Sequence, residues 1–507
     1  MKINTQNSTF LFTLSFIEGA SVMSAELIGA KMLAPYFGSS LFVWATVMAV
    51  TLGGLALGYF TGGFFAEKNK NNNFLFFIVL SASIFTALMP ISSKLILMLT
   101  VNLPLLTSII ITTILFLMPP VFLMGMVSPL IIERLSNNNN HAGKTSGNIY
   151  AISTLGGIIA TFGMGFYIIP HFGLSKPAYF TGIFLALLPI IAIFKDKKKA
   201  IPLLLFFVFF GRFIFIQNSV PSDIKILYQK EGILGQIMVV DYPVYQTSNT
   251  PDYHIRMMLF NRVIQTILNK NDATNQYFPY VHLLIKESVH QMNGGKALLL
   301  GLGGGCVANE LLNNNFEVDA VELDERVGTA ARDYFDLNQK VNVHIEDARR
   351  FINNTKKKYD LIIFDVFKGE ENPAHIITKE SLEIVKSKLN TSGMIVINGY
   401  GYRTGNKSKG TKAIVKTLQQ AGFYTNILPS SKKEDEGNLL IFAKQFNFKT
   451  QNKAFTFSTI DIQQAPVLSD DQPILELLNI EAVAAWRGAY IATAIKDFNQ
   501  RNVPLFN

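Results

Sequence analysis

The sequence has 507 residues, of which 49% are hydrophobic and only 16% charged, and its mean hydropathy is +0.28. Soluble domains carry roughly 25% charged residues, so a single soluble globule is excluded. The net charge of +9 arises mainly in the first 218 residues, which hold 13 basic and 5 acidic side chains. Basic residues beside apolar runs indicate membrane topology rather than nucleic-acid binding. The single cysteine, Cys306, excludes an internal disulfide framework and a cysteine-rich metal site.

The N-terminal part contains six apolar runs that are each long enough to cross a bilayer, which takes about 20 residues. We expect membrane helices near residues 10–33, 40–65, 74–99, 105–132, 148–169 and 177–194. A weaker seventh candidate covers residues 201–216, a length of about 24 Å as a helix. Pro202 and Arg212 weaken it further.

The loops between these runs indicate an orientation. Basic clusters follow the second, fourth and sixth runs, at residues 67–70, 134–144 and 195–199. They therefore fall on one side, which we expect to be the cytoplasmic side of a bacterial inner membrane. If residues 201–216 cross the bilayer, the C-terminal half lies outside the cytoplasm. If they form an interfacial or re-entrant segment, which their short length favours, that half is cytosolic.

Two features inside the apolar runs have more than one interpretation. Gly54, Gly58 and Gly62 recur every four residues, which predicts either close helix packing or helices that line a transport path. Glu18 and Glu26 lie in the first run, where a charge is costly and usually faces a cavity or a partner. They support the alternative of a transporter bundle with a regulatory nucleotide domain.

After Pro221 the pattern changes to that of a folded α/β region. Short alternating runs at 225–228, 235–240 and 257–260 predict a small β-meander. Strands then alternate with helices, which predicts a parallel, doubly wound, Rossmann-like sheet. These strands are expected at 297–300, 318–323, 341–345, 361–365 and 394–397, with a late antiparallel strand at 438–444.

These patterns divide the chain into four parts. We expect a transmembrane helical bundle of six or seven spans over 1–218 and a small β-rich, substrate-side subdomain over 219–292. A Rossmann-like nucleoside-binding domain should cover 293–446. Residues 447–507 form an extension whose pattern indicates no role.

A glycine-rich turn is the strongest chemical signal. Gly301, Gly303, Gly304 and Gly305 follow an apolar strand and open a helix, so a nucleotide can approach the backbone closely. Glu322 ends the next strand, 21 positions after Gly301. A separation of about 20 is typical of a carboxylate that binds ribose hydroxyls. Together these residues predict a nucleoside site.

Two more acids stand at predicted strand ends. Asp347 follows the third strand, where it could meet an adenine amino group. Asp365 ends the fourth strand, at the crevice where open α/β sheets bind ligands. A carboxylate at this position could take a proton from an attacking amine.

At this point the sequence resembles a known family, the spermidine synthases or polyamine aminopropyltransferases. The resemblance rests on residues 299–310, 359–365 and 378–380. Residues 26–67 are similar to the bacterial branch that is fused to a membrane bundle, and the resemblance covers roughly residues 10–445. It implies a class I methyltransferase or spermidine synthase-like fold. It also implies transfer of an aminopropyl group from decarboxylated S-adenosylmethionine to a diamine, without a metal.

The resemblance carries roles to individual residues. Glu322 matches the ribose-binding acid, Asp347 the adenine-contacting acid and Asp365 the acid that deprotonates the amine. Gln236 and Gln265 fall near two substrate-binding glutamines of the β-region, and His282 near a histidine that follows them.

The sequence also departs from the family pattern. Soluble synthases have Asp in the middle of the glycine-rich turn, where this chain has Gly304, and an acid three residues after the catalytic one, where it has Lys368. A unit charge pair is worth about 4 kcal/mol at an effective dielectric constant of about 20, so these changes matter. Glu370 and Glu371 could restore negative charge.

These departures leave two alternatives to the aminopropyltransferase open. One is a methyltransferase that uses S-adenosylmethionine, and the other is a non-catalytic membrane scaffold that kept the fold. The expected partners are a small-molecule amine and the lipid bilayer, with a homodimer as a candidate assembly and no nucleic acid.

Overall fold

The computed structural model describes most of the chain, in two compact units. The described residues are 8–68, 72–100, 103–136, 142–193, 211, 220–245, 253–271, 277–366, 373–430, 436–447 and 460–504. The first unit consists of Met1–Val220, Lys230–Gln236 and Ala494–Asn507, and the second of Pro221–Gln229 and Ile237–Thr493. The seventh apolar run, 201–216, lies outside the described residues except for residue 211.

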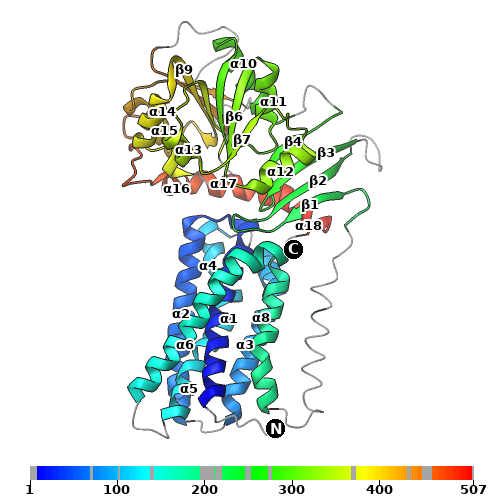
Figure 1. Ribbon diagram of the computed structural model, residues 1–507, viewed down its shortest axis with the longest axis vertical. Helices are drawn as coiled ribbons and strands as arrows, with labels where there is room; N and C mark the ends of the chain where they lie inside the picture. Colours follow the sequence, from blue (N-terminus) through cyan, green and yellow to red (C-terminus); the bar gives the residue numbers. More distant parts are fainter. Residues whose placement is uncertain are drawn as a thin grey trace. The chain divides into compact units, whose positions relative to one another are not determined.

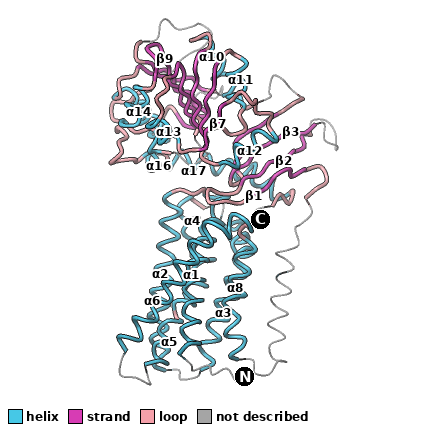
Figure 2. The backbone as a smooth tube through the Cα atoms, in the orientation of Figure 1, coloured by secondary structure: helices cyan, strands magenta, loops and turns pink. Residues whose placement is uncertain are grey.

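The first unit is a bundle of long helices that run side by side (Figures 1 and 2). Its helices are α1 (Ser8–Phe37), α2 (Leu41–Lys68), α3 (Asn72–Thr100), α4 (Leu105–Gly125), α5 (Val127–Ser136), α6 (Ala142–Gly163), α7 (Ile169–Phe172) and α8 (Ser175–Ile193). A π-helical turn, Met164–Ile168, joins α6 to α7. Among the described residues, six helical segments are long and apolar enough to cross a membrane. The expected six apolar helices are therefore confirmed.

The glycine row of α2 lies where this helix packs closely on the α4–α5 segment. A Cβ atom at Gly58 would lie 2.4 Å from the carbonyl oxygen of Phe122, and one at Gly62 would lie 2.7 Å from that of Met126. Only glycine permits this approach of two helix backbones. The row therefore serves helix packing. Glu18 is buried between α1 and α6, where it accepts a hydrogen bond from Ser153 at 3.1 Å.

The second unit contains a small antiparallel sheet. Its strands are β1 (Lys225–Lys230), β2 (Ile237–Val244), β3 (Tyr253–Phe260) and β4 (Val263–Leu268), in that spatial order. The sequence did not predict β4. A two-residue turn, Asn261 and Arg262, joins it to β3, and both residues have positive φ angles, of 47° and 64°. Glycine usually occupies such turns, so its absence concealed the hairpin.

A seven-stranded mixed sheet forms the centre of the second unit (Figure 2). The strand order is β10-β11-β9-β8-β5-β6-β7. The strands are β5 (Gly295–Leu300), β6 (Phe316–Glu322), β7 (Asn342–Ile345), β8 (Tyr359–Phe364), β9 (Leu389–Tyr402), β10 (Tyr424–Pro429) and β11 (Glu436–Lys444). The neighbours from β9 to β7 are parallel, whereas β11 is antiparallel to both β9 and β10. The expected Rossmann-like sheet with a late antiparallel strand is thus confirmed, and β10 is an addition.

Helices cover both faces of this sheet (Figure 1). The helices of the second unit are α10 (Pro279–Gln291), α11 (Cys306–Asn313), α12 (Glu325–Tyr334), α13 (Ala348–Asn354), α14 (Lys379–Ser387), α15 (Lys409–Gln420), α16 (Leu475–Leu478) and α17 (Ile480–Tyr490). A further helix, α18 (Lys496–Gln500), belongs to the first unit. Alternate strand residues face opposite layers: Leu298 and Leu300 pack with α13, α14 and α15, whereas Ala297 and Leu299 pack with α10 and α11. Burial on both faces explains why these strands are continuously apolar.

Candidate functional site

The candidate site lies along the carboxyl ends of the parallel strands. Because β8, β5, β6 and β7 are neighbours in that order, Asp365, the glycine-rich turn, Glu322 and Asp347 follow one another along this edge. The amide of Asp365 donates to the Leu300 carbonyl at 2.8 Å. A Cβ atom at Gly301 would lie 2.3 Å from the carbonyl oxygen of Asp365. The parallel topology thus brings together groups that lie far apart in the sequence.

The glycine-rich turn needs its glycines for backbone conformation. Gly301, Gly303 and Gly305 have φ angles of 85°, 52° and 80°, in the left-handed region that side chains disfavour. Gly305 directly precedes α11, whose first residue is Cys306. The turn therefore places the amino end of α11 at the strand edge, as the sequence predicted.

Gly304 has a different reason to lack a side chain. Its amide donates a hydrogen bond of 2.8 Å to Oγ1 of Thr266, on β4. A Cβ atom at this position would lie 2.6 Å from Cγ2 of Thr266 and 2.9 Å from the ring of Phe335. The position at which soluble synthases carry an Asp is thus filled by neighbouring side chains. Sequence reasoning did not identify Thr266.

Glu322 is buried at the end of β6 and is held by backbone amides. Its Oε2 accepts from Leu302 in the glycine-rich turn at 3.1 Å, and its Oε1 accepts from Asp324 at 3.0 Å. Beside the acids at this edge, the apolar side chains Leu323 and Ile345 are 49% and 47% exposed. Two apolar surfaces therefore flank the carboxylates.

Asp347 caps α13 and also has a partly exposed carboxylate. One oxygen accepts from the Arg350 amide at 2.9 Å, and the other lies 3.4 Å from Nε2 of His375. The cap alone would account for an Asp at this position. The second oxygen and His375, which sequence reasoning missed, add polar groups at the strand edge.

Asp365 is half-buried, and two neutral side chains hold its carboxylate. Oδ1 accepts from the Asn398 amide at 2.7 Å, and Oδ2 accepts from the Tyr280 hydroxyl at 3.0 Å. Asn398 in turn accepts from Asn438 at 3.0 Å. Burial raises the pKa of Asp365, and the hydrogen bonds from Asn398 and Tyr280 offset only part of this rise. The arrangement orients a carboxylate whose affinity for a proton is increased.

Two neighbours of Asp365 bear on its chemistry. Burial, with the Asp365 carboxylate, raises the pKa of Tyr280 well above its usual value, so this phenol remains a donor. Burial also raises the pKa of Cys306 to about 12, so its sulfur is a thiol at neutral pH. Cys306 is therefore not an activated nucleophile. Among the described residues, no group of three His, Cys, Asp or Glu side chains could hold a metal ion.

The predicted substrate-side residues do not bond to Asp365 in this structure. Gln265 donates to the carbonyl of Val263 on its own strand at 3.4 Å. The ring of His282 stacks on that of Tyr277, with centroids 5.8 Å apart. The buried Nε2 of His282 has no hydrogen-bond partner in the described part of the chain.

The remaining predicted residues lie elsewhere. Gln236 belongs to the first unit, where it donates to Glu231 at 2.7 Å. Lys368, Glu370 and Glu371 lie outside the described residues.

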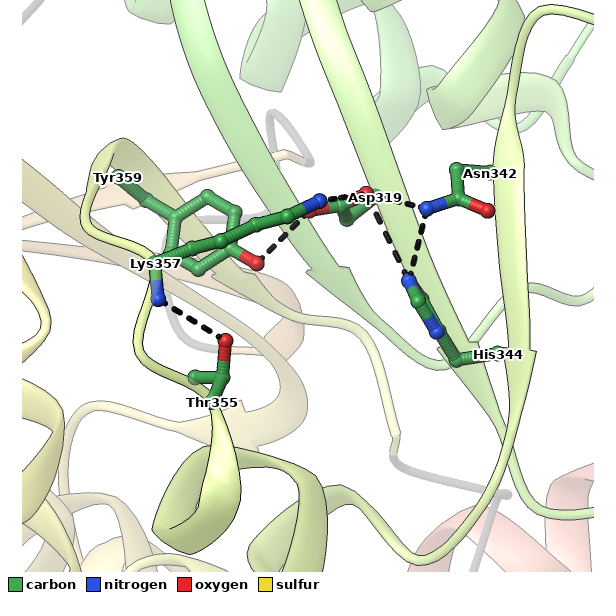
Figure 3. Close-up of polar contacts among 6 residues, drawn as sticks. All are labelled: Asp319, Asn342, His344, Thr355, Lys357 and Tyr359. Carbon is green, nitrogen blue, oxygen red and sulfur yellow. Dashed lines mark hydrogen bonds and ion pairs between the residues drawn. The ribbon is translucent and has the colours of Figure 1, made fainter.

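A second polar cluster lies towards the amino ends of β7 and β8 (Figure 3). The buried Asp319 of β6 accepts hydrogen bonds from Lys357, Tyr359 and Asn342, each at 2.8 Å. His344 lies 3.6 Å from the same carboxylate. Burial would raise the pKa of Asp319, but these hydrogen bonds and the Lys357 charge outweigh it, so the pKa is lowered. We call these residues the Asp319 cluster.

Comparison with known proteins shows what the second unit is similar to. Residues 281–445 match the family model described as the spermine/spermidine synthase domain. The resemblance seen in the sequence is therefore confirmed, and the matched residues include the glycine-rich turn and the three acids at the strand edge.

Individual relatives extend this result. A protein named polyamine aminopropyltransferase 2, from Aquifex aeolicus, is 23% identical over 82% of this chain and 84% of its own length. A polyamine aminopropyltransferase from Vibrio vulnificus is 37% identical over 24% of this chain and 44% of its own length. An N-terminal histidine N-methyltransferase from Emericella nidulans is 34% identical over 25% of this chain and 24% of its own length. The chain thus spans less than half the length of the last two relatives.

Among solved structures, the spermidine synthase from Thermotoga maritima is similar with 16% identity and a TM-score of 0.34, over 52% of this chain and 88% of that chain.

Proposed function

We propose that the chain is a membrane-bound, spermidine synthase-like transferase that moves an alkyl group from an S-adenosylmethionine-type sulfonium to an amine. The observation that carries this proposal is the half-buried Asp365 carboxylate, which lies next to the glycine-rich turn at the strand edge. In the described part of the chain, its oxygens accept only from Asn398 and Tyr280, which are neutral. It is therefore available to an amine.

The donor nucleoside would lie across the glycine-rich turn and the end of β6. Glu322 would accept hydrogen bonds from the ribose hydroxyls, and Asp347 would accept one from the adenine amino group. Leu323 and Ile345 are exposed apolar side chains next to these acids, which suits the faces of a purine ring. Gln236, Gln265 and His282 remain proposals for the acceptor side.

The reaction would be a direct displacement. The amine nitrogen forms a bond to the carbon attached to the sulfonium, and the carbon–sulfur bond breaks. The sulfur keeps the electron pair and becomes a neutral thioether. The new ammonium passes a proton to Asp365, whose raised pKa suits it to act as a base. Orientation of the amine and the sulfonium would supply most of the rate.

The six apolar helices support the membrane part of the proposal. Many large side chains on these helices are exposed, including Phe60 at 76% and Leu99 at 81%. Such surfaces are stable in lipid and aggregate in water. The basic loops favour a bacterial inner membrane, with the transferase unit in the cytosol where sulfonium donors are made.

Methyl transfer is a second candidate, and Gly304 favours it. A carboxylate at this position would bind the ammonium of a decarboxylated donor. The side chains of Thr266 and Phe335 already occupy the space that a carboxylate side chain at position 304 would need. S-Adenosylmethionine carries its own carboxylate, and a turn without Asp repels it less.

Calorimetry on the full-length chain in lipid nanodiscs would test the donor. We expect binding of methylthioadenosine and of either decarboxylated or intact S-adenosylmethionine, and mass spectrometry would show which group reaches a panel of diamines. Glu322→Gln should abolish nucleoside binding, whereas Glu310→Gln, on α11, serves as a control. If the folded wild type binds no adenine nucleoside, the scaffold alternative replaces both enzymes.

A reporter joined after Asp223 would test the topology. We expect a cytosolic signal, and an extracytoplasmic one would contradict a transferase that depends on cytosolic donors.

A further inference from the structure

Residues 460–490 belong to the extension whose sequence indicates no role, and we call them the C-terminal strap. The strap contacts elements of the second unit that carry candidate site residues. At one end, the Asp470 carboxylate accepts two hydrogen bonds of 2.6 Å from the Arg349 guanidinium. Arg349 lies on α13, the helix that Asp347 caps. This end of the strap is thus tied beside the proposed adenine site.

The other end of the strap forms an aromatic stack with β9. The ring of Trp486 lies 6.2 Å from that of Tyr400 and is stacked on that of Tyr490 at 5.2 Å, with 17° between the planes. Tyr400 is two residues after Asn398, which holds Asp365. The stack therefore connects the strand next to the proposed base with residue 490.

Tyr490 then reaches the turn between β3 and β4. Its hydroxyl donates to the carbonyl of Arg262 at 2.9 Å and accepts from the amide of Ile264 at 3.0 Å. Arg262 has a φ angle of 64°, a conformation that a non-glycine residue adopts at some cost. One hydroxyl therefore pairs both a donor and an acceptor of a turn that is intrinsically unfavourable.

The β3–β4 hairpin carries this restraint to the glycine-rich turn. Thr266, two residues after Ile264, accepts the hydrogen bond from the Gly304 amide. A Phe at position 490 could still stack on Trp486, but it could not bond to the backbone. The hydroxyl of Tyr490 therefore links the strap to the hairpin. The hairpin in turn contacts the glycine-rich turn through Thr266.

We propose that the C-terminal strap holds the β3–β4 hairpin against the glycine-rich turn, with Tyr490 as a positioning residue for the donor site. The nature of the donor rests on the proposed function. Tyr490 has no part in the chemistry and acts through Thr266. It should affect how well the donor is held more than how fast it reacts.

The test compares Tyr490→Phe with Tyr424→Phe in the full chain, since Tyr424 is an exposed tyrosine on β10 of the same unit. In Tyr490→Phe, hydrogen exchange of the peptide covering residues 261–268 should be roughly fivefold faster, as expected for loss of a backbone partner. The affinity for methylthioadenosine should weaken by a similar factor. In transfer assays, KM for the donor should rise while kcat stays unchanged. Tyr424→Phe should change none of these quantities.

Unchanged exchange and unchanged nucleoside affinity in a folded Tyr490→Phe chain would overturn the proposal, as would a fall in kcat without a rise in KM. If Tyr490→Phe does not fold, Trp486→Phe loosens the same stack and is read in the same way. If the wild type binds no methylthioadenosine, the proposed function fails. The exchange of residues 261–268 then still decides whether the strap holds the hairpin.

Discussion

Two acids of the same unit, the buried Asp319 and the half-buried Asp365, differ in their surroundings. Asp319 is bonded to Lys357, Tyr359 and Asn342, and its pKa is lowered. Among the residues that the structure describes, Asp365 receives hydrogen bonds from Asn398 and Tyr280 only, and its pKa is raised. The partners of Asp319 compensate its burial and favour the charged form, whereas the neutral donors of Asp365 leave its affinity for a proton increased. The difference distinguishes a structural acid from a candidate base.

The largest expected effect tests the candidate base. Asp365→Asn should lower the transfer rate by about 100- to 10,000-fold, the usual contribution of a general base. Donor affinity should be unchanged, because Glu322 and the glycine-rich turn remain. Product formation followed by mass spectrometry measures the rate, and Asp471→Asn, at an exposed position, is the control. An Asp365→Asn chain with full activity would remove Asp365 from the mechanism.

Substitution of Asp319 should instead reduce stability and leave activity unchanged. Asp319→Ala should lower the free energy of unfolding by about 2–3 kcal/mol, because the buried Tyr359 hydroxyl and its neighbours lose their acceptor. Folded Asp319→Ala should keep its activity. Trp486 fluorescence in a Trp44→Phe background reports unfolding of the second unit. Lys357→Met should lower the free energy of unfolding by less, because Lys357 is about half exposed and its ion pair is screened. A decrease equal to or greater than that of Asp319→Ala would contradict this account.

The two carboxylates should also have opposite effects on the pH dependence of stability. The lowered pKa of Asp319 contributes stability above its unfolded value, near pH 4, and this contribution is lost as the pH falls through the folded pKa. The raised pKa of Asp365 contributes stability below pH 4, which is lost as the pH rises through the folded pKa. Relative to wild type, Asp365→Asn should therefore gain stability as the pH rises above 4. Asp319→Asn should instead lose stability as the pH rises towards 4, and the difference should stay level above that pH. Denaturation curves between about pH 3 and 8 measure both trends, and trends of equal sign would invalidate the comparison.

The smallest expected effect concerns the pKa of Asp365. Asn398→Ala removes a hydrogen bond that lowers the pKa of Asp365, so the pKa should rise further. The acidic limb of the kcat/KM profile should then move to higher pH. Asn390→Ala, at the start of the same strand and bonded to Asp360, is the matched control. A profile that does not move would show that Asp365 does not determine that limb.

The sequence predicted the apolar helices and most of the sheet because their patterns are long and have few alternatives. It missed β4 because the turn of Asn261 and Arg262 contains no glycine. It also missed β10, whose sequence combines polar residues and a proline with only two aliphatic side chains. Within the site, the acids at strand ends could be predicted from their positions. Tyr280 could not, since it meets Asp365 only through the packing of α10. Asn398 could have been predicted, because it is a polar residue directly after the apolar run 394–397.

The insertion of β11 between β9 and β10 has a consequence for biosynthesis. As the nascent chain leaves the ribosome, β10 emerges before β11, yet its neighbour in the sheet is β11. Until residue 444 has emerged, β9 therefore presents an open edge to other chains, and such edges promote aggregation. A reporter protein fused between residues 402 and 444 would report misassembly as well as location, so topology fusions belong before residue 225 or after residue 444.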